Sequence, residues 1–246
     1  METKIYDHLL SSKKAGKKLL GVLLDPDRDG LEQLLPQLKQ NPPDWLLVGG
    51  SLISRRNISV FLREIAPHLS CPVIIFPGDR VQVSQHADGI LLLSLISGRN
   101  PEYLIGQQVV AAPLLKESGL ELMPTGYILV ESGTLTTAHY MSQSLPIPQR
   151  KPEMAAITAL AGEQLGLKII YLDGGSGADF PISAQMINAT ANMLQIPLIV
   201  GGGIDTAAKL GNAYRAGADV VVVGTAIERS PNLYKDFIAE KEKYSQ

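Results

Sequence analysis

The sequence has few of the features that mark secreted, membrane-spanning or nucleic-acid-binding proteins. Cys71 is the only cysteine in 246 residues, which excludes an internal disulfide framework and fits a reducing cytosol. No run of about twenty apolar residues occurs, and the N-terminal segment has no small-residue cleavage site, so we expect neither a membrane span nor a signal peptide. The formal net charge of −2, without a charged block, argues against a nucleic-acid partner. These absences predict a soluble, cytoplasmic protein.

The signatures of metal-binding histidines and of nucleotide loops are also missing. The four histidines, at positions 8, 68, 86 and 139, do not have a metal-ligand spacing, and we expect all four on the surface or in loops. Cys71 precedes Pro72 and follows an expected helix, which favours a small core residue over a reactive thiol. The sequence contains no P-loop, and no early strand runs into G-x-G-x-x-G.

What the sequence does contain is a regular alternation of apolar and amphipathic segments. Eight short apolar segments predict strands that are buried on both faces, as in a parallel sheet covered by helices. They span residues 19–24, 44–48, 73–76, 89–95, 120–130, 169–172, 197–200 and 219–223. The expected fold class is α/β, a single (β/α)8 TIM barrel over residues 1–246. A doubly wound sheet is the alternative, which the missing G-x-G-x-x-G disfavours.

Helices are expected between these strands. They span residues 31–38, 57–69, 101–118, 152–165, 183–194, 205–216 and 231–243, with residues 1–18 as an N-terminal helical extension. Residues 79–85 are short for a covering helix, so the third helix is expected to be abbreviated. Residues 131–151 predict a long loop with about one helical turn, and loops of this length are often functional. Pro124 should lie near the entry of its strand or at an irregularity.

Three consecutive strands end in glycine-rich turns. The segments are IIYLDGGSG at 169–177, IPLIVGGGI at 196–204 and ADVVVVGTAI at 218–227. In a barrel the last loops and a short helix N-terminus often form a phosphate cup, in which backbone N–H groups bind the anion. Tight barrel turns without a ligand are the alternative, but three such turns in succession favour phosphate binding.

Asp173 follows the sixth expected strand and lies beside this cup. A carboxylate there can accept a proton from a substrate hydroxyl, or it can cap the turn. Tyr171 lies two residues earlier and points inward like Asp173, because side chains alternate along a strand. It can reach the same ligand or fill the barrel interior.

A second acidic cluster follows the first expected strand. Asp25, Asp27 and Asp29 offer hard oxygen ligands that suit Mg²⁺, which is usually held by one or two carboxylates and substrate phosphates. Ser51, at the end of the adjacent strand, offers a hydroxyl to the same ion. Helix N-capping by Asp27 or Asp29 is an equally strong interpretation of the cluster taken alone.

Motifs along nearly the whole chain, from about residue 19 to 232, resemble one family. They are LLDPDRDG, VGGS, SLISGRNPEYLIG, PTGYILVESG, KPEMAAITALAGEQLG, YLDGGSG, VGGGI and VVVGTAIE. The family is that of geranylgeranylglyceryl phosphate synthase, a group of barrel prenyltransferases that includes heptaprenylglyceryl phosphate synthase. The most specific pieces are DPD together with YLDGGSG. The segments PTGYILVESG and KPEMAAITALAGEQLG resemble the second branch of the family.

The resemblance implies a chemistry and a set of site residues. The family transfers a prenyl group from an allylic diphosphate, here expected to be geranylgeranyl diphosphate, to the 3-hydroxyl of sn-glycerol 1-phosphate with Mg²⁺. Matched positions give Asp25 and Ser51 as Mg²⁺ contacts and Asp173 as the base. Matched positions also give the glycerol phosphate contacts: Tyr171, Leu172, Asp173, Gly174, Gly175, Ser176, Gly177, Gly202, Gly203, Gly224 and Thr225.

The resemblance also concerns the prenyl tail and assembly. The apolar trough for the tail is expected around residues 89–105, although any single leucine or isoleucine there can equally be barrel core. Family members form dimers or larger rings, so we expect a homo-oligomer, a dimer or hexamer. A lipid product implies delivery to a membrane, and without an anchor that contact would be peripheral.

Two residues depart from the family pattern. Asp173 stands where glutamate is usual, which shortens the arm of the proposed base, and Leu23 stands where other branches have a lysine. The missing charge would then come from Arg28 or Arg99. Two other functions remain as alternatives: a phosphosugar isomerase or lyase on the same barrel, and a non-catalytic phosphate-binding protein.

Overall fold

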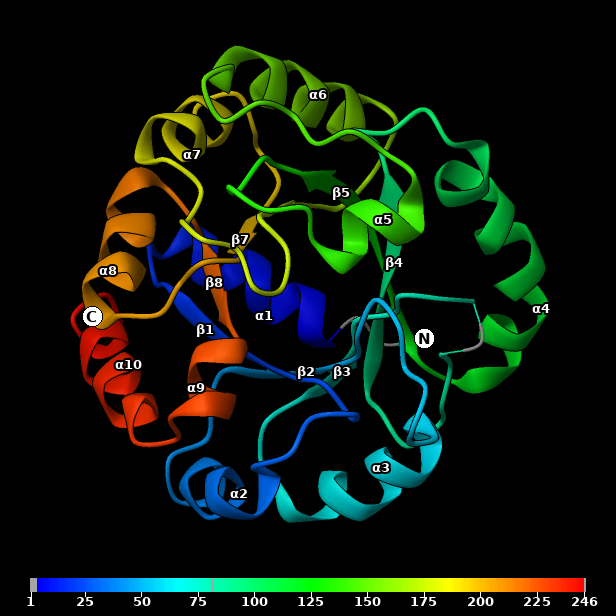
Figure 1. Ribbon diagram of the computed structural model, residues 1–246, viewed down its shortest axis with the longest axis vertical. Coiled ribbons are helices and arrows are strands. Elements are labelled where there is room, and N and C mark those ends of the chain that lie inside the picture. Colours follow the sequence, from blue (N-terminus) through cyan, green and yellow to red (C-terminus); the bar gives the residue numbers. More distant parts are fainter. Residues whose placement is uncertain (1–3, 81, 246) are drawn as a thin grey trace.

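The chain folds into a closed parallel barrel (Figure 1). The computed structural model describes residues 4–80 and 82–245. Within them, eight strands pair in chain order, and β1 closes the barrel against β8 through the pair Leu19 and Val220. The strands are β1 Leu19–Leu24, β2 Trp45–Val48, β3 Val73–Ile75, β4 Gly89–Leu95, β5 Glu121–Leu129, β6 Ile169–Asp173, β7 Leu198–Gly201 and β8 Val220–Val223. The predicted (β/α)8 barrel is confirmed, and the doubly wound alternative is wrong.

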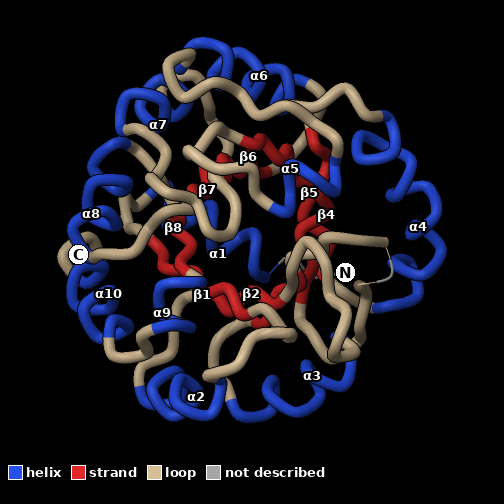
Figure 2. Tube along the Cα trace, in the orientation of Figure 1, coloured by secondary structure: helices blue, strands red, loops and turns tan. Residues whose placement is uncertain are grey.

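Helices form a ring around the barrel (Figure 2). The outer helices are α2 Leu31–Gln40, α3 Ile58–Ile65, α4 Gln107–Ser118, α6 Pro152–Gln164, α7 Ala184–Ala191, α8 Ala207–Ala216 and α10 Leu233–Glu242. A 3-10 turn, η1 Ala66–His68, extends α3, and a π-helical turn, η2 Glu102–Gly106, leads into α4. Between β3 and β4 the described residues contain no helix, so the third unit is abbreviated as predicted.

The core has two layers, one inside the barrel and one between barrel and helices. Trp45, Leu91 and Met123 pack inside the barrel, whereas Leu20, Leu46 and Ile170 face the helices. Alternating side chains of apolar strands supply both layers, which explains why the strands lack a polar face.

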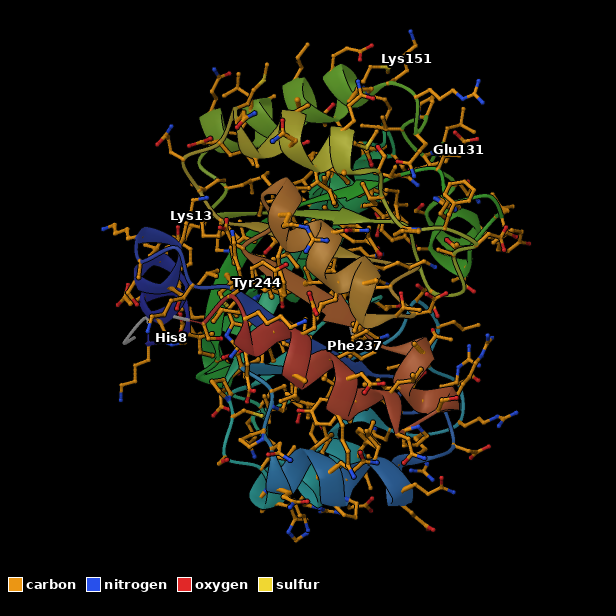
Figure 3. All side chains as sticks on the ribbon, turned by 90° about the vertical axis from the view of Figure 1, so that its left-hand side faces the viewer. His8, Lys13, Glu131, Lys151, Phe237 and Tyr244 are labelled. Atoms are coloured by element: carbon orange, nitrogen blue, oxygen red, sulfur yellow. The ribbon has the colours of Figure 1, made fainter. Side chains whose placement is uncertain are left out.

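One end of the barrel is closed by α1 Lys4–Lys14. Its residues Ile5 and Leu9 belong to the inner layer, and the buried Glu121 carboxylate accepts hydrogen bonds from the backbone N–H groups of Ile5 and Tyr6. In the side view, His8 and Lys13 lie at this end and Glu131 lies at the opposite one (Figure 3). The opposite end, where the strands finish, is therefore the open mouth.

Pro124 lies inside β5, paired with Leu92 of β4. Its carbonyl accepts a hydrogen bond from Lys168 N on the β6 side, the side to which its own nitrogen also points. A backbone N–H at position 124 would point toward the segment just before β6, which begins at Ile169. The N–H that proline lacks therefore leaves no carbonyl group of β6 without a donor. The proline is thus at the entry of the β5–β6 pairing, though not of β5 itself.

Two short helices lie at the mouth. The long loop after β5 contains α5 Thr137–Ser142, which projects over the barrel interior and not into the outer ring (Figures 1 and 2). The helix α9 Thr225–Arg229 follows β8 directly and was not predicted as a separate element. The backbones of α5 and α9 therefore both lie beside the predicted phosphate cup.

Several smaller predictions can be compared with the structure. Cys71 is buried, and burial raises the pKa of its thiol to about 11, as expected for a core residue. His8, His68 and His86 are exposed, whereas His139 lies in the long loop after β5, on its short helix α5, where it is buried and not at the surface. Among the helices described, none has the length and apolar character needed to cross a membrane.

Candidate functional site

The mouth contains a cavity of about 600 Å³ that is lined from both sides of the barrel. Most of the predicted site residues meet there: Asp25, Ser51, Tyr171, Asp173, Gly175, Ser176, Gly177, Gly202, Gly203, Gly224 and Thr225. Leu172 and Gly174 are not in the lining. The side chain of Leu172 packs in the outer core layer, and Gly174 donates its N–H to Gly201 O.

The glycine loops approach one another too closely for side chains. A Cβ on Gly202, whose φ is +86°, would lie 2.7 Å from Gly174, so this crossing of two loops requires glycine. The hydroxyls of Ser176 and Thr225 lie 3.1 Å apart and join the β6 loop to the start of α9. Three loops thus form one wall of the cavity, where backbone N–H groups suit an anion without a cationic side chain.

Asp173 ends β6 at the edge of this wall and is buried. Its Oδ1 accepts a 2.8 Å hydrogen bond from Gly175 N, which caps the turn, and its Oδ2 accepts a 2.5 Å hydrogen bond from the Tyr127 hydroxyl. Burial raises the pKa of Asp173, while Tyr127, Gly175 N–H and His139 oppose that rise. A carboxylate with a raised pKa is better suited to accept a proton than an exposed one.

Aromatic rings hold this carboxylate in place. Tyr171 stacks on Phe76 with ring centroids 5.2 Å apart, and Tyr127 meets both rings edge to face at 5.7 and 5.8 Å. Burial raises the pKa of Tyr127 and the nearby charge of Asp173 raises it further, so the phenol is a hydrogen-bond donor throughout the neutral range. Tyr127 was not predicted as a site residue, although its inward direction follows from the alternation along β5.

Asp27 of the acidic cluster does not cap a helix but binds the loop after β2. Asp27 accepts hydrogen bonds from the backbone N–H groups of Ser54, Arg55 and Arg56; desolvation opposes the effect, but these bonds hold its pKa below the usual value. It therefore anchors the loop after Ser51. The helix-capping interpretation is wrong, because α2 starts at Gly30 without a side-chain cap.

Asp25 has room for a cation. Its Oδ1 accepts a 3.0 Å bond from Asp27 N, and its Oδ2 lies 3.9 Å from Arg28 Nε. A Cβ on Gly50 would lie 3.2 Å from the Asp25 carboxylate, so glycine keeps the space before that group open. Sequence reasoning missed Glu228, whose carboxylate accepts the Asp25 N–H at 3.0 Å and whose pKa burial raises.

This donor set fits Mg²⁺ only in part. Carboxylate and hydroxyl oxygens are the ligands Mg²⁺ prefers, and the ion commonly adds substrate phosphates to one or two carboxylates. Among the residues placed in the structure, no three His, Cys, Asp or Glu side chains are grouped to hold a metal by themselves. Asp25 and Ser51 thus suit an ion that arrives with a diphosphate, whereas a preformed all-protein cage is not provided.

A second, apolar pocket of about 110 Å³ adjoins the mouth. Part of its lining comes from residues 89–105, where the prenyl trough was expected: Ile90, Leu92, Leu93, Leu95 and Tyr103. Ala111 and Leu115 of α4, outside that range, also line it. The two cavities share Gly50, Ser51, Phe76, Tyr127 and Ala138. A ligand with a polar head and an apolar tail can therefore span the junction.

Arg28 and Arg99 are the two residues that could replace the charge of the lysine that other branches of the family have at the position of Leu23. They lie in different places. Arg28 lines the mouth cavity beside Asp25, so it is available to an anion there. Arg99 donates to the carbonyl groups of Gly98 and Ile96 and is not part of the lining of either cavity. Arg28 is the better placed of the two.

Comparisons with known proteins agree with this geometry. The model of the PcrB family matches residues 15–242. A geranylgeranylglyceryl phosphate synthase of Spirosoma linguale is 49% identical over 237 residues, covering 95% of each chain, and one of Pyrococcus horikoshii is 38% identical over 228 residues, covering 91% of this chain and 89% of that one.

The same name appears among solved structures. The crystal structure of (S)-3-O-geranylgeranylglyceryl phosphate synthase from Thermoplasma acidophilum, in complex with its substrate sn-glycerol-1-phosphate, is 30% identical. It superposes with a TM-score of 0.90 over 100% of this chain and 99% of its own.

Proposed function

The chain belongs to the PcrB family, and from this premise we propose that it is a prenyltransferase that makes an ether lipid phosphate. It joins the prenyl group of geranylgeranyl diphosphate to the 3-hydroxyl of sn-glycerol 1-phosphate and releases diphosphate, with Mg²⁺ as cofactor. The relatives' names and the glycerol phosphate bound to the Thermoplasma structure support this proposal.

One observation carries the proposal most strongly: the polar mouth and the apolar pocket meet at Gly50 and Ser51. In prenyl transfer the reacting carbon of the donor lies between its diphosphate and its hydrocarbon tail. The acceptor hydroxyl must lie beside that carbon. A phosphosugar isomerase or lyase needs the phosphate cup but not the apolar pocket.

In the proposed complex, the glycine loops bind the phosphate of the acceptor. Gly177, Gly202 and Gly203 have positive φ values and line the cavity, so their backbone N–H groups would be donors to this phosphate. The glycerol moiety would then extend from this wall toward Asp173. Ser176 and Thr225 add hydroxyl groups at the rim of the same wall.

Asp173 takes the proton of the attacking hydroxyl. The hydroxyl oxygen then bonds to the prenyl carbon as the bond from that carbon to the diphosphate oxygen breaks. Tyr127 donates to the Oδ2 of Asp173 and stabilises its ionised form, so that the carboxylate is ready to accept the proton despite its burial. The partly buried ring of Phe76 and the buried ring of Tyr171 stack on each other and give this part of the cavity an apolar wall.

Asp25, Ser51 and Arg28 would hold the diphosphate at the other side of the mouth. Mg²⁺ bound there would neutralise the charge that develops on the leaving group. Glu228 positions the backbone of Asp25 by accepting its N–H. The tail would lie in the apolar pocket against β4 and α4.

The remaining partners are proposals of the same kind. We propose that the protein forms homo-oligomers, dimers or hexamers, and that it contacts membranes only peripherally when it delivers its lipid product. Neither property is needed for the chemistry described above.

The test is product formation from purified components. Incubation with geranylgeranyl diphosphate, sn-glycerol 1-phosphate and Mg²⁺ should release diphosphate and form the ether lipid phosphate, and EDTA should stop the reaction. Prenyl transfer that is unchanged in Asp25→Asn and independent of Mg²⁺ would contradict the metal role, whereas the absence of any ether lipid phosphate would favour isomerase or lyase chemistry.

A further inference from the structure

Phe76 follows β3 directly and lies where the two cavities meet, yet the chemistry above uses its ring only as an apolar wall. The described residues that line both cavities are Gly50, Ser51, Phe76, Tyr127 and Ala138. None of these five side chains is charged. Phe76 and Tyr127 supply the aromatic rings of the junction, and the hydroxyl of Tyr127 is already bonded to Asp173.

The backbone fixes Phe76 beside the loop that follows β2. Its N–H donates to Val48 O at 2.9 Å, and its carbonyl lies so near Gly49 that a Cβ on that glycine would overlap it. Two residues further along, a Cβ on Gly78 would lie 2.8 Å from Ser51 Cα. Glycine at both positions lets the two loops pack closely, so Phe76 lies next to the diphosphate side of the mouth.

The ring itself extends toward the acceptor side. It stacks on Tyr171 with ring centroids 5.2 Å apart and planes 13° from parallel, and Tyr127 meets it at a steep angle, with centroids 5.8 Å apart. Tyr171 precedes Asp173 by two residues on β6. Phe76 is nevertheless only half-buried and lines both cavities, so part of it is open to a ligand.

This junction is the place for the reacting carbon of the prenyl donor. In the proposed complex the diphosphate lies in the mouth and the tail in the apolar pocket, so the carbon that joins them lies at the residues that the two cavities share. That carbon gains positive charge while its bond to the diphosphate oxygen breaks, because the oxygen keeps the electron pair. The face of an aromatic ring attracts a cation within about 6 Å of its centroid, most strongly when both are removed from water.

We propose that Phe76 is a catalytic residue that stabilises the positive charge on the allylic carbon through the π electrons of its ring. The inference rests on the proposed function. The carbon–oxygen bond to diphosphate breaks, the oxygen of the acceptor hydroxyl bonds to the same carbon, and its proton passes to Asp173. Phe76 forms no bond and takes no proton, and an aliphatic side chain in its place would keep the apolar wall without this attraction.

The test changes the π electrons of the ring and leaves its shape nearly unaltered. Phenylalanine analogues with one, two or three ring fluorines, inserted at position 76 through a reassigned stop codon, withdraw electron density from the ring stepwise. The same series at Phe61 of α3 is the matched control, because that ring is buried in the outer core layer and is not in the lining of either cavity.

The expected result is a graded loss at position 76 alone. The rate constant for prenyl transfer in a single turnover should fall with each added fluorine, by about tenfold for the trifluorinated ring. The KM for the donor should change little, since the charge develops only in the transition state. A rate constant that is independent of fluorination at position 76 overturns the proposal, and so does an equal decline in the Phe61 series.

A pair of ordinary variants keeps the inference testable if a fluorinated protein fails to fold. Phe76→Leu retains an apolar side chain without π electrons and should lose about tenfold or more in the same rate constant, whereas Phe76→Tyr keeps a ring and should lose much less. Equal losses in the two variants overturn the role of Phe76 alone. Absence of an ether lipid phosphate with the wild type overturns the proposed function, and this inference with it.

Discussion

The Tyr127 hydroxyl donates a 2.5 Å hydrogen bond to Oδ2 of Asp173, from β5 to β6 across the inner face of the barrel. The β5–β6 register places Leu129 opposite Asp173, so Tyr127 lies two residues below the carboxylate and reaches up to it. The side chain of Asp173 is one methylene group shorter than that of the glutamate usual in the family that the sequence resembles. The phenol fixes this short arm in one position.

Removal of this phenol should change the pH dependence of catalysis. Burial raises the pKa of Asp173 and the Tyr127 bond opposes the rise, so Tyr127→Phe should raise that pKa further. The base is then ionised only at higher pH, so the acid limb of the plot of kcat against pH should shift to higher pH. The rate should therefore fall at the acid end of the profile and be retained at its alkaline end. A uniform loss at every pH would indicate a packing defect instead.

Asp25→Asn should weaken the response to Mg²⁺. The variant removes one anionic oxygen from the site that faces the diphosphate, and kcat/KM should fall roughly a hundredfold while the Mg²⁺ concentration for half-maximal rate rises. The matched control is Asp29→Asn, an exposed neighbour outside the cavity lining, which should behave like the wild type. Equal effects in both variants would point to general electrostatics.

The apolar pocket should determine the length of the prenyl donor. Ala111 of α4 is buried and lines the pocket, so Ala111→Phe should fill it and favour farnesyl over geranylgeranyl diphosphate by about tenfold or more. Ala112 is exposed on the same helix, and Ala112→Phe should leave the preference unchanged. Competition between the two donors, read by product mass, gives the ratio directly.

Cys71 should be inert in the folded protein. Burial raises the pKa of its thiol to about 11, so at pH 8 the thiolate that reacts with disulfide reagents is roughly a thousandth of the total. Labelling with Ellman's reagent should be slow in the native state and complete in guanidinium chloride. Rapid native labelling would show that the residue is accessible.

The sequence was sufficient to predict the barrel because its strands are apolar on both faces. The segments 19–24 and 89–95 coincide with β1 and β4, whose flanking turns are marked by Pro26 and by glycine. The helix α9 was missed because its five residues are too few to show a helical period. Pro124 could be placed only once the start of β6 was known.

The residues that line the mouth cavity could be predicted where a loop motif contains them, and were missed where only tertiary contacts bring them there. The glycine turns and Asp173 are readable along the chain. Tyr127 acquires its role from a partner 46 positions away, and Asp27 from a loop 27 to 29 positions away. His139 appears as an ordinary loop histidine until the structure shows that it is buried and that its Nδ1 accepts the Thr136 N–H at the start of α5.

The central claim is that the joined cavities unite a prenyl diphosphate with sn-glycerol 1-phosphate. The most direct measurement is mass spectrometry of the product formed from this acceptor, Mg²⁺ and an equimolar mixture of farnesyl, geranylgeranyl and heptaprenyl diphosphates. We predict geranylgeranylglyceryl phosphate as the main product, with its formation abolished in Asp173→Asn. The absence of an ether-linked glycerol phosphate of any prenyl length would contradict the account.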